Sequence, residues 1–188
     1  MYNFSVPDIC DEFSDIQIGD LFLNSYGSKN KFFGQIHTAK CEHSNSIVKE
    51  FVNEQGEGKV LLIEHTGSEL CSMVGDQIAQ KAYENKWNGI LTNGCIRDVE
   101  IIQNIDIGVY AQNTYPKKTD KSVGIGKKDV PIKLGSVEIN PGDWIYVDCN
   151  GWIVSKKRLV LYSFYMLIFL LFVLFKPVFK IFSIFLIF

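Results

Sequence analysis

Hydrophobic and polar positions follow two different periods along this chain, and together they predict a mixed α/β protein. Apolar residues between 78 and 87 recur at the spacing of one buried helix face, which predicts a helix beginning at Asp76. Residues 60–63 are apolar at every position, as expected for a strand covered on both faces of a sheet. A strand of this kind requires a layer of structure above it and another below it.

Turn residues divide the rest of the chain into short segments. Helices are predicted over residues 5–13 and 46–52, the second capped by Ser44 or Asn45. Further strands are predicted at 35–41, 70–74, 90–92, 107–111, 130–132, 137–139, 144–147 and 152–154. The closely spaced late strands favour an antiparallel section. The expected fold is therefore a single α/β domain with helices packed on a mixed sheet.

The stretch from Asp76 to Asp98 is the part of the chain most indicative of chemistry. Gly89 is expected to end the helix, and Gly94 is expected to end a short strand and turn the chain. This path would place Arg97 and Asp98 at the start of a second helix. A helix N-terminus, an arginine and a carboxylate could therefore converge.

Each of these groups suits a small oxo-acid or a metal ion. Free N–H groups at the start of the Asp76 helix suit an anion, and Arg97 offers a fork for a carboxylate or an enolate oxygen. Asp98 offers a hard oxygen ligand for a divalent cation. The same spacing would also arise if Asp76 and Asp98 only capped their helices, so both interpretations stay open at this point.

Charge and cysteine content narrow the class of protein. The 188 residues include 19 basic and 21 acidic side chains, and the last 30 residues contain only Lys176 and Lys180 as charged groups. The first 158 residues thus carry 17 basic and 21 acidic residues, a net charge of −4, which does not favour direct nucleic-acid binding.

The five cysteines are odd in number and widely spaced. With no basic and apolar leader at the start, they predict reduced thiols in a cytoplasmic protein. Cys95 lies beside the candidate site but lacks a recognisable histidine partner, so we interpret it as a buried thiol rather than a nucleophile.

The C-terminal region differs from the rest of the chain. Residues 159–175 contain no charged side chain, and Lys156, Lys157 and Arg158 stand directly before them. This pattern fits a membrane anchor that holds the body on the cytoplasmic side. It also fits translation or a gene model that has run past the true end of the protein. In either case we expect a catalytic domain over 1–157 and a separate apolar tail over 158–188.

The order of residues in the central stretch resembles a known family. Asp76 and Arg97 are separated by 20 residues and Asp98 follows directly, which is similar to the Asp-x20-Arg-Asp signature of the 4-hydroxy-4-methyl-2-oxoglutarate/4-carboxy-4-hydroxy-2-oxoadipate aldolases. The chain resembles still more closely their shorter relatives, which are similar to the regulator of ribonuclease E activity. The supporting stretches are 34–36, 56–61, 74–76, 94–99, 106–109 and 141–143.

The resemblance implies a fold, an assembly and an activity. The fold would be a swivelling β/β/α layered sheet with flanking helices, assembled as a homotrimer or hexamer. The activity would be that of a metal-dependent lyase, which cleaves 4-hydroxy-4-methyl-2-oxoglutarate and related 4-hydroxy-2-oxo acids to pyruvate. Decarboxylation of oxaloacetate would be a side activity, because both reactions leave the enolate of pyruvate.

The resemblance also implies roles for individual residues. Asp98 would hold Mg²⁺ or Mn²⁺, and Arg97 would bind the pyruvyl unit and stabilise the enolate. Asp76 would orient its turn or a metal-bound water, while N–H groups of the helix start hold the substrate carboxylate. The substrate-binding set would be Gly75, Asp76, Gln77, Ile78 and Arg97.

The alternative is a non-catalytic trimeric regulator that binds and inhibits an RNA-processing ribonuclease or helicase. The intact set of Asp76, Arg97 and Asp98 favours catalysis, because a docking protein has no chemical need for it. The longer aldolases are thought to complete their site with an acidic residue of a neighbouring subunit, and the sequence does not reveal its counterpart.

Overall fold

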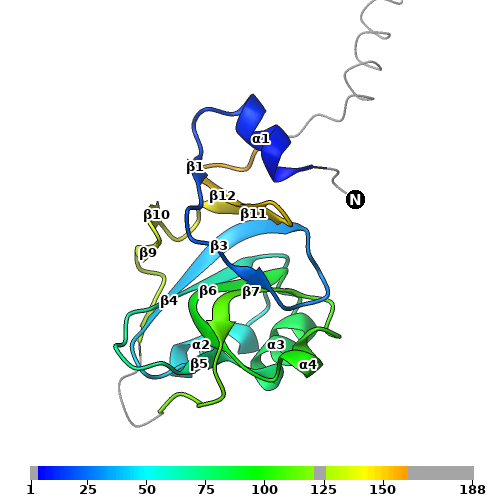
Figure 1. The fold of residues 1–188 in the computed structure, drawn as a ribbon. Coiled ribbons are helices and arrows are strands. Elements are labelled where there is room, and N and C mark those ends of the chain that lie inside the picture. Colours follow the sequence, from blue (N-terminus) through cyan, green and yellow to red (C-terminus); the bar gives the residue numbers. More distant parts are fainter. Residues whose placement is uncertain (1–3, 121–125, 161–188) are drawn as a thin grey trace, which may run out of the picture. The chain divides into compact units, whose positions relative to one another are not determined.

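The centre of the fold is a mixed sheet of ten strands among the residues that the structure describes (Figure 1). The protein is represented by a computed structural model, which describes residues 4–120 and 126–160. Within it, Ser5–Arg158 forms one compact unit. The predicted mixed α/β fold is confirmed.

The elements are short and many. The helices are α1 (Val6–Glu12), α2 (Ser46–Asn53), α3 (Asp76–Glu84) and α4 (Val99–Ile102). The first seven strands are β1 (Gln17–Ile18), β2 (Asn24–Ser25), β3 (Phe32–Cys41), β4 (Val60–His65), β5 (Ser72–Val74), β6 (Gly89–Ile96) and β7 (Gly108–Thr114). The others are β8 (Lys127–Lys128), β9 (Ile132–Leu134), β10 (Val137–Ile139), β11 (Trp144–Asp148) and β12 (Gly151–Ser155).

Four parallel strands form the middle of the sheet. The order along the sheet is β1-β12-β11-β3-β4-β6-β7-β2, with β5 paired to β6 and β8 to β3. Strands β3, β4, β6 and β7 are parallel, while β11, β12, β1 and β2 join antiparallel at the two sides. The late antiparallel section predicted from the sequence is therefore present.

Both faces of the central strand β4 are covered, as its continuous apolar run predicts. Leu61 and Ile63 are fully buried on the face that packs against α2 and α3. Val60 and Leu62 are fully buried on the opposite face, in a cluster that includes Ile132 and other residues of the β9–β10 hairpin. The molecule thus has a hairpin layer, a curled sheet and a helical layer, which agrees with the β/β/α arrangement expected.

The structure corrects two local predictions in the central stretch. Gly89 does not end the helix, because α3 ends at Glu84 and Gly89 is the first residue of β6. Gly94 does not turn the chain, because β6 continues through it to Ile96. Parallel pairing to β7 resumes at Cys95 after an irregularity between Thr92 and Cys95, and pairing to β5 begins at Cys95. The Thr92 hydroxyl accepts a hydrogen bond from the Gly94 N–H at 2.9 Å. Gly94 therefore marks a bulge within a strand, for which an internal glycine is typical.

Other boundaries differ in smaller ways. The two-residue strands β1, β2 and β8 were not predicted, because two residues cannot display a period. The predicted helix starts at 46 and 76 are confirmed, and Ser5 caps α1 by accepting a hydrogen bond from the Asp8 N–H.

The domain division at 157 stays a prediction, because most of the apolar tail lies outside the described residues. Within residues 4–120 and 126–160, no helix combines the length and the apolar character needed to cross a bilayer.

The packing of Phe32 yields a test of the sheet. Its ring lies where a Cβ atom on Gly89 of β6 or Gly108 of β7 would stand. We expect Gly108→Ala to lower the free energy of unfolding by about 2 kcal/mol through overpacking. In a Phe32→Leu background the same change should cost less than half as much, as measured by urea unfolding of the four variants. Equal costs in both backgrounds would contradict this packing.

A cationic cavity at the carboxyl edge of the sheet

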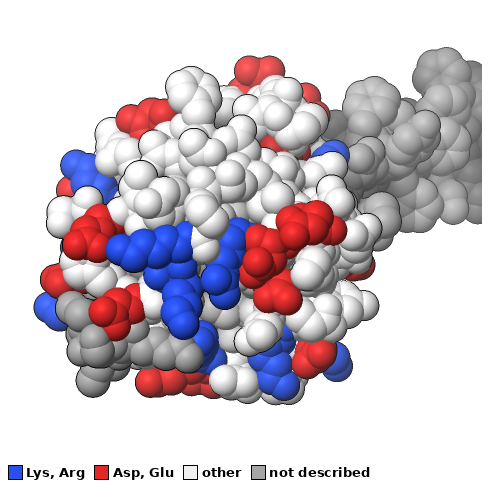
Figure 2. All heavy atoms as spheres, turned by 60° about the horizontal axis from the view of Figure 1, so that its bottom comes forward, with Lys and Arg blue, Asp and Glu red and all other residues white. Residues whose placement is uncertain are grey.

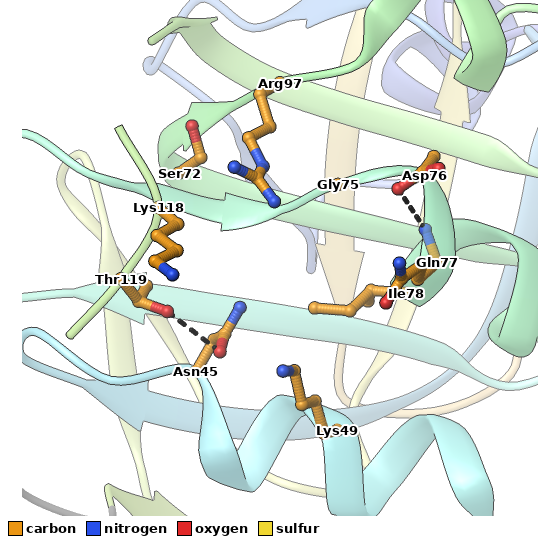
Figure 3. Close-up of a pocket in the computed structure, with 10 residues that line it drawn as sticks. All are labelled: Asn45, Lys49, Ser72, Gly75, Asp76, Gln77, Ile78, Arg97, Lys118 and Thr119. Carbon is orange, nitrogen blue, oxygen red and sulfur yellow. Dashed lines mark hydrogen bonds between the residues drawn. The ribbon is translucent and has the colours of Figure 1, made fainter. Parts of the chain in front are cut away.

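The candidate site is a cavity of about 250 Å³ beside the carboxyl ends of β5 and β6 (Figure 3). It is also bounded by the first turns of α2 and α3 and by the loop that follows β7. The lining residues are Asn45, Lys49, Ser72, Gly75, Asp76, Gln77, Ile78, Arg97, Lys118 and Thr119. All five residues of the predicted substrate-binding set are among them.

Parallel strands bring these residues together, because strands that run in the same direction end at the same edge of the sheet. Strand β5 ends at Val74 and leads through Gly75 into α3, while the neighbouring β6 ends at Ile96 and leads into Arg97. The Arg97 N–H donates a hydrogen bond to the Val74 carbonyl at 3.1 Å. This bond fixes the start of the Arg97 side chain beside the turn that opens α3.

Glycine at position 75 leaves room for the charged side chains beside it. A Cβ atom there would stand 2.8 Å from Asp98 Oδ2 and 3.4 Å from Arg97 Nε. These two atoms are 3.3 Å apart and form an ion pair whose side chains are 33% and 39% exposed. Such a half-exposed pair adds little stability, so its main effect is to orient the guanidinium.

Asp98 does not act as a helix cap through its side chain. It occupies the N-cap position of α4 with left-handed backbone angles, φ 59° and ψ 35°, and its side chain makes no cap hydrogen bond. The carboxylate instead faces Arg97. The Asp98 side chain therefore has no capping role in this structure. Left-handed backbone angles at a residue other than glycine are often found at functional sites.

Asp76 occupies the first helical position of α3, after Gly75 as N-cap. Its Oδ1 atom accepts a hydrogen bond from the Gln77 N–H at 2.7 Å, while the Ile78 N–H donates to the Gly75 carbonyl at 3.1 Å. Both N–H groups expected to bind a substrate carboxylate thus have an intramolecular acceptor in this structure. Their role in substrate binding stays a prediction.

Five lining residues were not anticipated as site residues: Asn45, Lys49, Ser72, Lys118 and Thr119. Asn45 and Thr119 lie across the cavity from Arg97 (Figure 3). The buried Asn45 side chain accepts a hydrogen bond from the Thr119 hydroxyl at 3.0 Å and donates one to the Met73 carbonyl at 2.9 Å, which holds this wall in place. Asn45 was considered only as a helix cap, and residues 118 and 119 lie in a loop without periodicity. No local signal distinguishes them.

Positive charge dominates the cavity. In Figure 3 the ammonium groups of Lys49 and Lys118 and the guanidinium of Arg97 point toward the same open space. Asp76 is the one acidic residue among the lining residues. Figure 2 shows basic side chains gathered on the face that includes the bottom of Figure 1. The cavity therefore suits a small ligand with more than one negative charge.

The donors available for a metal ion are few. Among the described residues, no group of three or more His, Cys, Asp or Glu side chains is arranged to hold one. Asp98 stands against Gly75 at the edge of the cavity without lining it. A single, partly exposed carboxylate fits a cation such as Mg²⁺, which keeps several of its waters when bound.

The surroundings of Cys95 do not activate its thiol as a nucleophile. Its side chain is buried, and burial raises the pKa of the thiol above its ordinary value. A raised pKa lowers the thiolate fraction at neutral pH, which agrees with the interpretation of Cys95 as a structural thiol.

A curled mixed sheet with a cationic cavity around Arg97 and the Asp-x20-Arg-Asp order is typical of the aldolase and ribonuclease-regulator class. The chain belongs to the RraA-like family, because the family model described as Aldolase/RraA matches residues 6–154.

Relatives of this chain share the fold and carry names for different functions. A "Putative 4-hydroxy-4-methyl-2-oxoglutarate aldolase" of Dechloromonas aromatica (strain RCB) is 45% identical over 161 residues, which are 83% of this chain and 98% of that protein. The solved structure of an S-adenosylmethionine:2-dimethylmenaquinone methyltransferase from Geobacillus kaustophilus HTA426 is 35% identical, with a TM-score of 0.80 over 85% of this chain and 99% of that one.

A third relative carries a regulatory name. The structure of the RNA-processing inhibitor RraA from Thermus thermophilis is 28% identical, with a TM-score of 0.79 over 85% of this chain and 96% of that one. The fold is thus shared by proteins named for three different functions, and the function of this chain has to be argued from its site.

The left-handed backbone at Asp98 can be tested through stability. Asp98→Gly and Asp98→Ala both remove the ion pair with Arg97, but only glycine adopts φ near +59° without strain. We expect the glycine variant to be about 1 kcal/mol more stable than the alanine variant in urea unfolding. Equal stabilities would show that the strained angle is absent in solution.

Proposed function

We propose that this protein is a divalent-metal-dependent lyase that cleaves 4-hydroxy-4-methyl-2-oxoglutarate and related 4-hydroxy-2-oxo acids to pyruvate. The observation that carries the proposal is the convergence of Arg97, Lys118 and Lys49 on one cavity in a chain of the RraA-like family. An anionic substrate with adjacent carboxylate and oxo groups matches these charges. The name of the Dechloromonas relative supports the same substrate.

The reaction is the reverse of an aldol addition. The bond between C3 and C4 breaks, and its electron pair passes into the enolate of pyruvate. The proton of the C4 hydroxyl leaves to a base, so that C4 becomes the carbonyl carbon of the second product. A proton then returns to C3 and completes pyruvate. The protein must therefore stabilise negative charge on the enolate oxygen.

Arg97 is the residue that meets this demand most directly. Its planar guanidinium donates two parallel hydrogen bonds, which suit the carboxylate and the 2-oxo oxygen of the pyruvyl unit. Asp98 holds Arg97 Nε at 3.3 Å and leaves the outer nitrogens directed into the cavity. Asp76 orders the first turn of α3 through its hydrogen bond to the Gln77 N–H.

Mg²⁺ or Mn²⁺ would be held by Asp98, whose carboxylate is accessible and close to Gly75 and Arg97. The bound cation would supply a Lewis acid that draws negative charge from the reacting carbonyl. Oxaloacetate decarboxylation is expected at the same site, because loss of carbon dioxide leaves the same enolate. A lysine Schiff base is not required by this scheme.

We further propose that the protein acts in the cytoplasm as a homotrimer or hexamer. Oligomers would allow a neighbouring subunit to contribute an acidic residue to the cavity. Asp76 is the one carboxylate among the residues that line the cavity in the described chain. A second carboxylate from a neighbouring subunit would supply the base that accepts the proton of the C4 hydroxyl.

A second candidate function is inhibition of an RNA-processing ribonuclease or helicase. The likeness to the RNA-processing inhibitor from Thermus thermophilis favours it. A regulator of this kind needs an exposed docking surface rather than a cavity. The two candidates therefore differ in which residues they require.

The lyase is tested by pyruvate release from 4-hydroxy-4-methyl-2-oxoglutarate and from oxaloacetate, with Mg²⁺, with Mn²⁺ and after chelation. We expect turnover that chelation abolishes and that Asp98→Ala lowers at least about a hundredfold, since a missing charge-stabilising group typically costs 10²–10³ in rate. Arg97→Lys should also lose most activity, because a point charge cannot replace the planar fork.

Near-normal kinetics in Arg97→Lys would count against its role at the pyruvyl unit, and an active Asp98→Ala would exclude the metal assignment. If the folded wild-type chain releases no pyruvate under any of these conditions, the regulator becomes the better candidate. It would then be tested by whether the protein slows RNA cleavage by ribonuclease E.

A further inference from the structure

A second hollow between α2 and α3 adjoins the cationic cavity. This outer hollow has a volume of about 160 Å³, and its lining residues are Lys49, Val52, Asn53, Gln77, Ile78 and Lys81. Lys49, Gln77 and Ile78 also line the inner cavity. The two hollows are therefore neighbouring compartments that share one wall.

Lys49 is the basic residue common to both compartments. It lies on α2, one turn after the helix begins, and Figure 3 shows its ammonium group directed upward from α2 toward the space that Arg97 enters from the opposite side. The outer hollow is lined by Lys81 as well, and Lys81 pairs with Glu84 at 3.5 Å. None of the six residues that line the outer hollow is acidic.

The space between the two cations is suited to a short carbon chain. Ile78 lines both compartments and presents an apolar side chain between the charged walls. A ligand with a negative group at each end and carbon between them would match this order of surfaces. A ligand with one negative end would leave Lys49 facing carbon atoms, which forfeits a charge-assisted hydrogen bond.

We propose that Lys49 binds the second carboxylate of a dicarboxylic substrate and so determines the preference of the site for 4-hydroxy-2-oxo dicarboxylates over monocarboxylates. The inference rests on the proposed lyase function. In this arrangement Arg97 holds the end that becomes pyruvate, and Lys49 holds the end that leaves as the second product. Lys49 is a specificity-determining residue and takes no part in breaking the bond.

The test compares two substrates that share the reacting centre. 4-Hydroxy-4-methyl-2-oxoglutarate has the second carboxylate, and 4-hydroxy-2-oxopentanoate lacks it. In the full-length protein we expect Lys49→Met to lower the ratio of their kcat/KM values about tenfold or more, chiefly by raising KM for the dicarboxylate. Lys49→Arg, which keeps the charge, should retain most of the wild-type ratio.

The matched control is Lys133→Met. Lys133 is exposed on β9, in the hairpin layer on the opposite face of the sheet, so the variant removes the same charge away from the cavity. Its ratio should equal that of the wild type. An unchanged ratio in Lys49→Met, or an equal fall in both variants, would overturn the assignment of Lys49.

Failure of the proposed function would be distinguishable from failure of this inference. If the wild-type chain cleaves neither substrate, the lyase is wrong, and binding decides the role of Lys49. Calorimetry would then compare 2-oxoglutarate with 2-oxobutanoate, which differ by the second carboxylate. Tighter binding of 2-oxoglutarate that Lys49→Met removes would support the second-carboxylate site, whereas equal affinities in the wild type would reject it.

Discussion

The burial of β4 on both faces is the constraint on which the rest of the structure depends. Because every residue of 60–63 is fully buried, the sheet has to be covered by α2 and α3 on one side and by the β9–β10 hairpin on the other. Parallel pairing of β4 with β3 and β6 then aligns the carboxyl ends of the central strands. The cavity lies at this edge, where helix starts and strand ends meet.

At that edge, the side chains of Arg97 and Asp98 lie close to the backbone of residue 75, because glycine has no side chain there. Gly75 provides room for the Asp98 carboxylate, and Asp98 orients the guanidinium of Arg97. Asp98 has left-handed backbone angles at the start of α4, and its carboxylate pairs with Arg97 instead of capping that helix. Three neighbouring positions thus constrain one another, although their ion pair contributes little to stability.

The different names within this fold are understandable from the same geometry. The sheet, the hairpin and the helices place the cationic cavity at one edge of the sheet. Proteins that share the sheet can therefore differ in what they bind, and the fold by itself does not select a lyase, a methyltransferase or an inhibitor of RNA processing. Their differences have to lie in particular side chains, and in this chain Arg97 and Lys49 are the side chains on which the proposed function and specificity rest.

The sequence by itself determined the buried strand at 60–63, the helix that begins at Asp76, and the convergence of Asp76 and Arg97 on one cavity, because each depends on a local period or a short ordered motif. It misplaced the end of the strand at Gly94, since pairing with β5 and β7 carries β6 past a glycine that reads locally as a turn. Only the tertiary structure brought Lys49 and Lys118 to the cavity. Their positions are decided by the packing of α2 and of the loop after β7, and contacts between residues far apart in the chain leave no periodic signal.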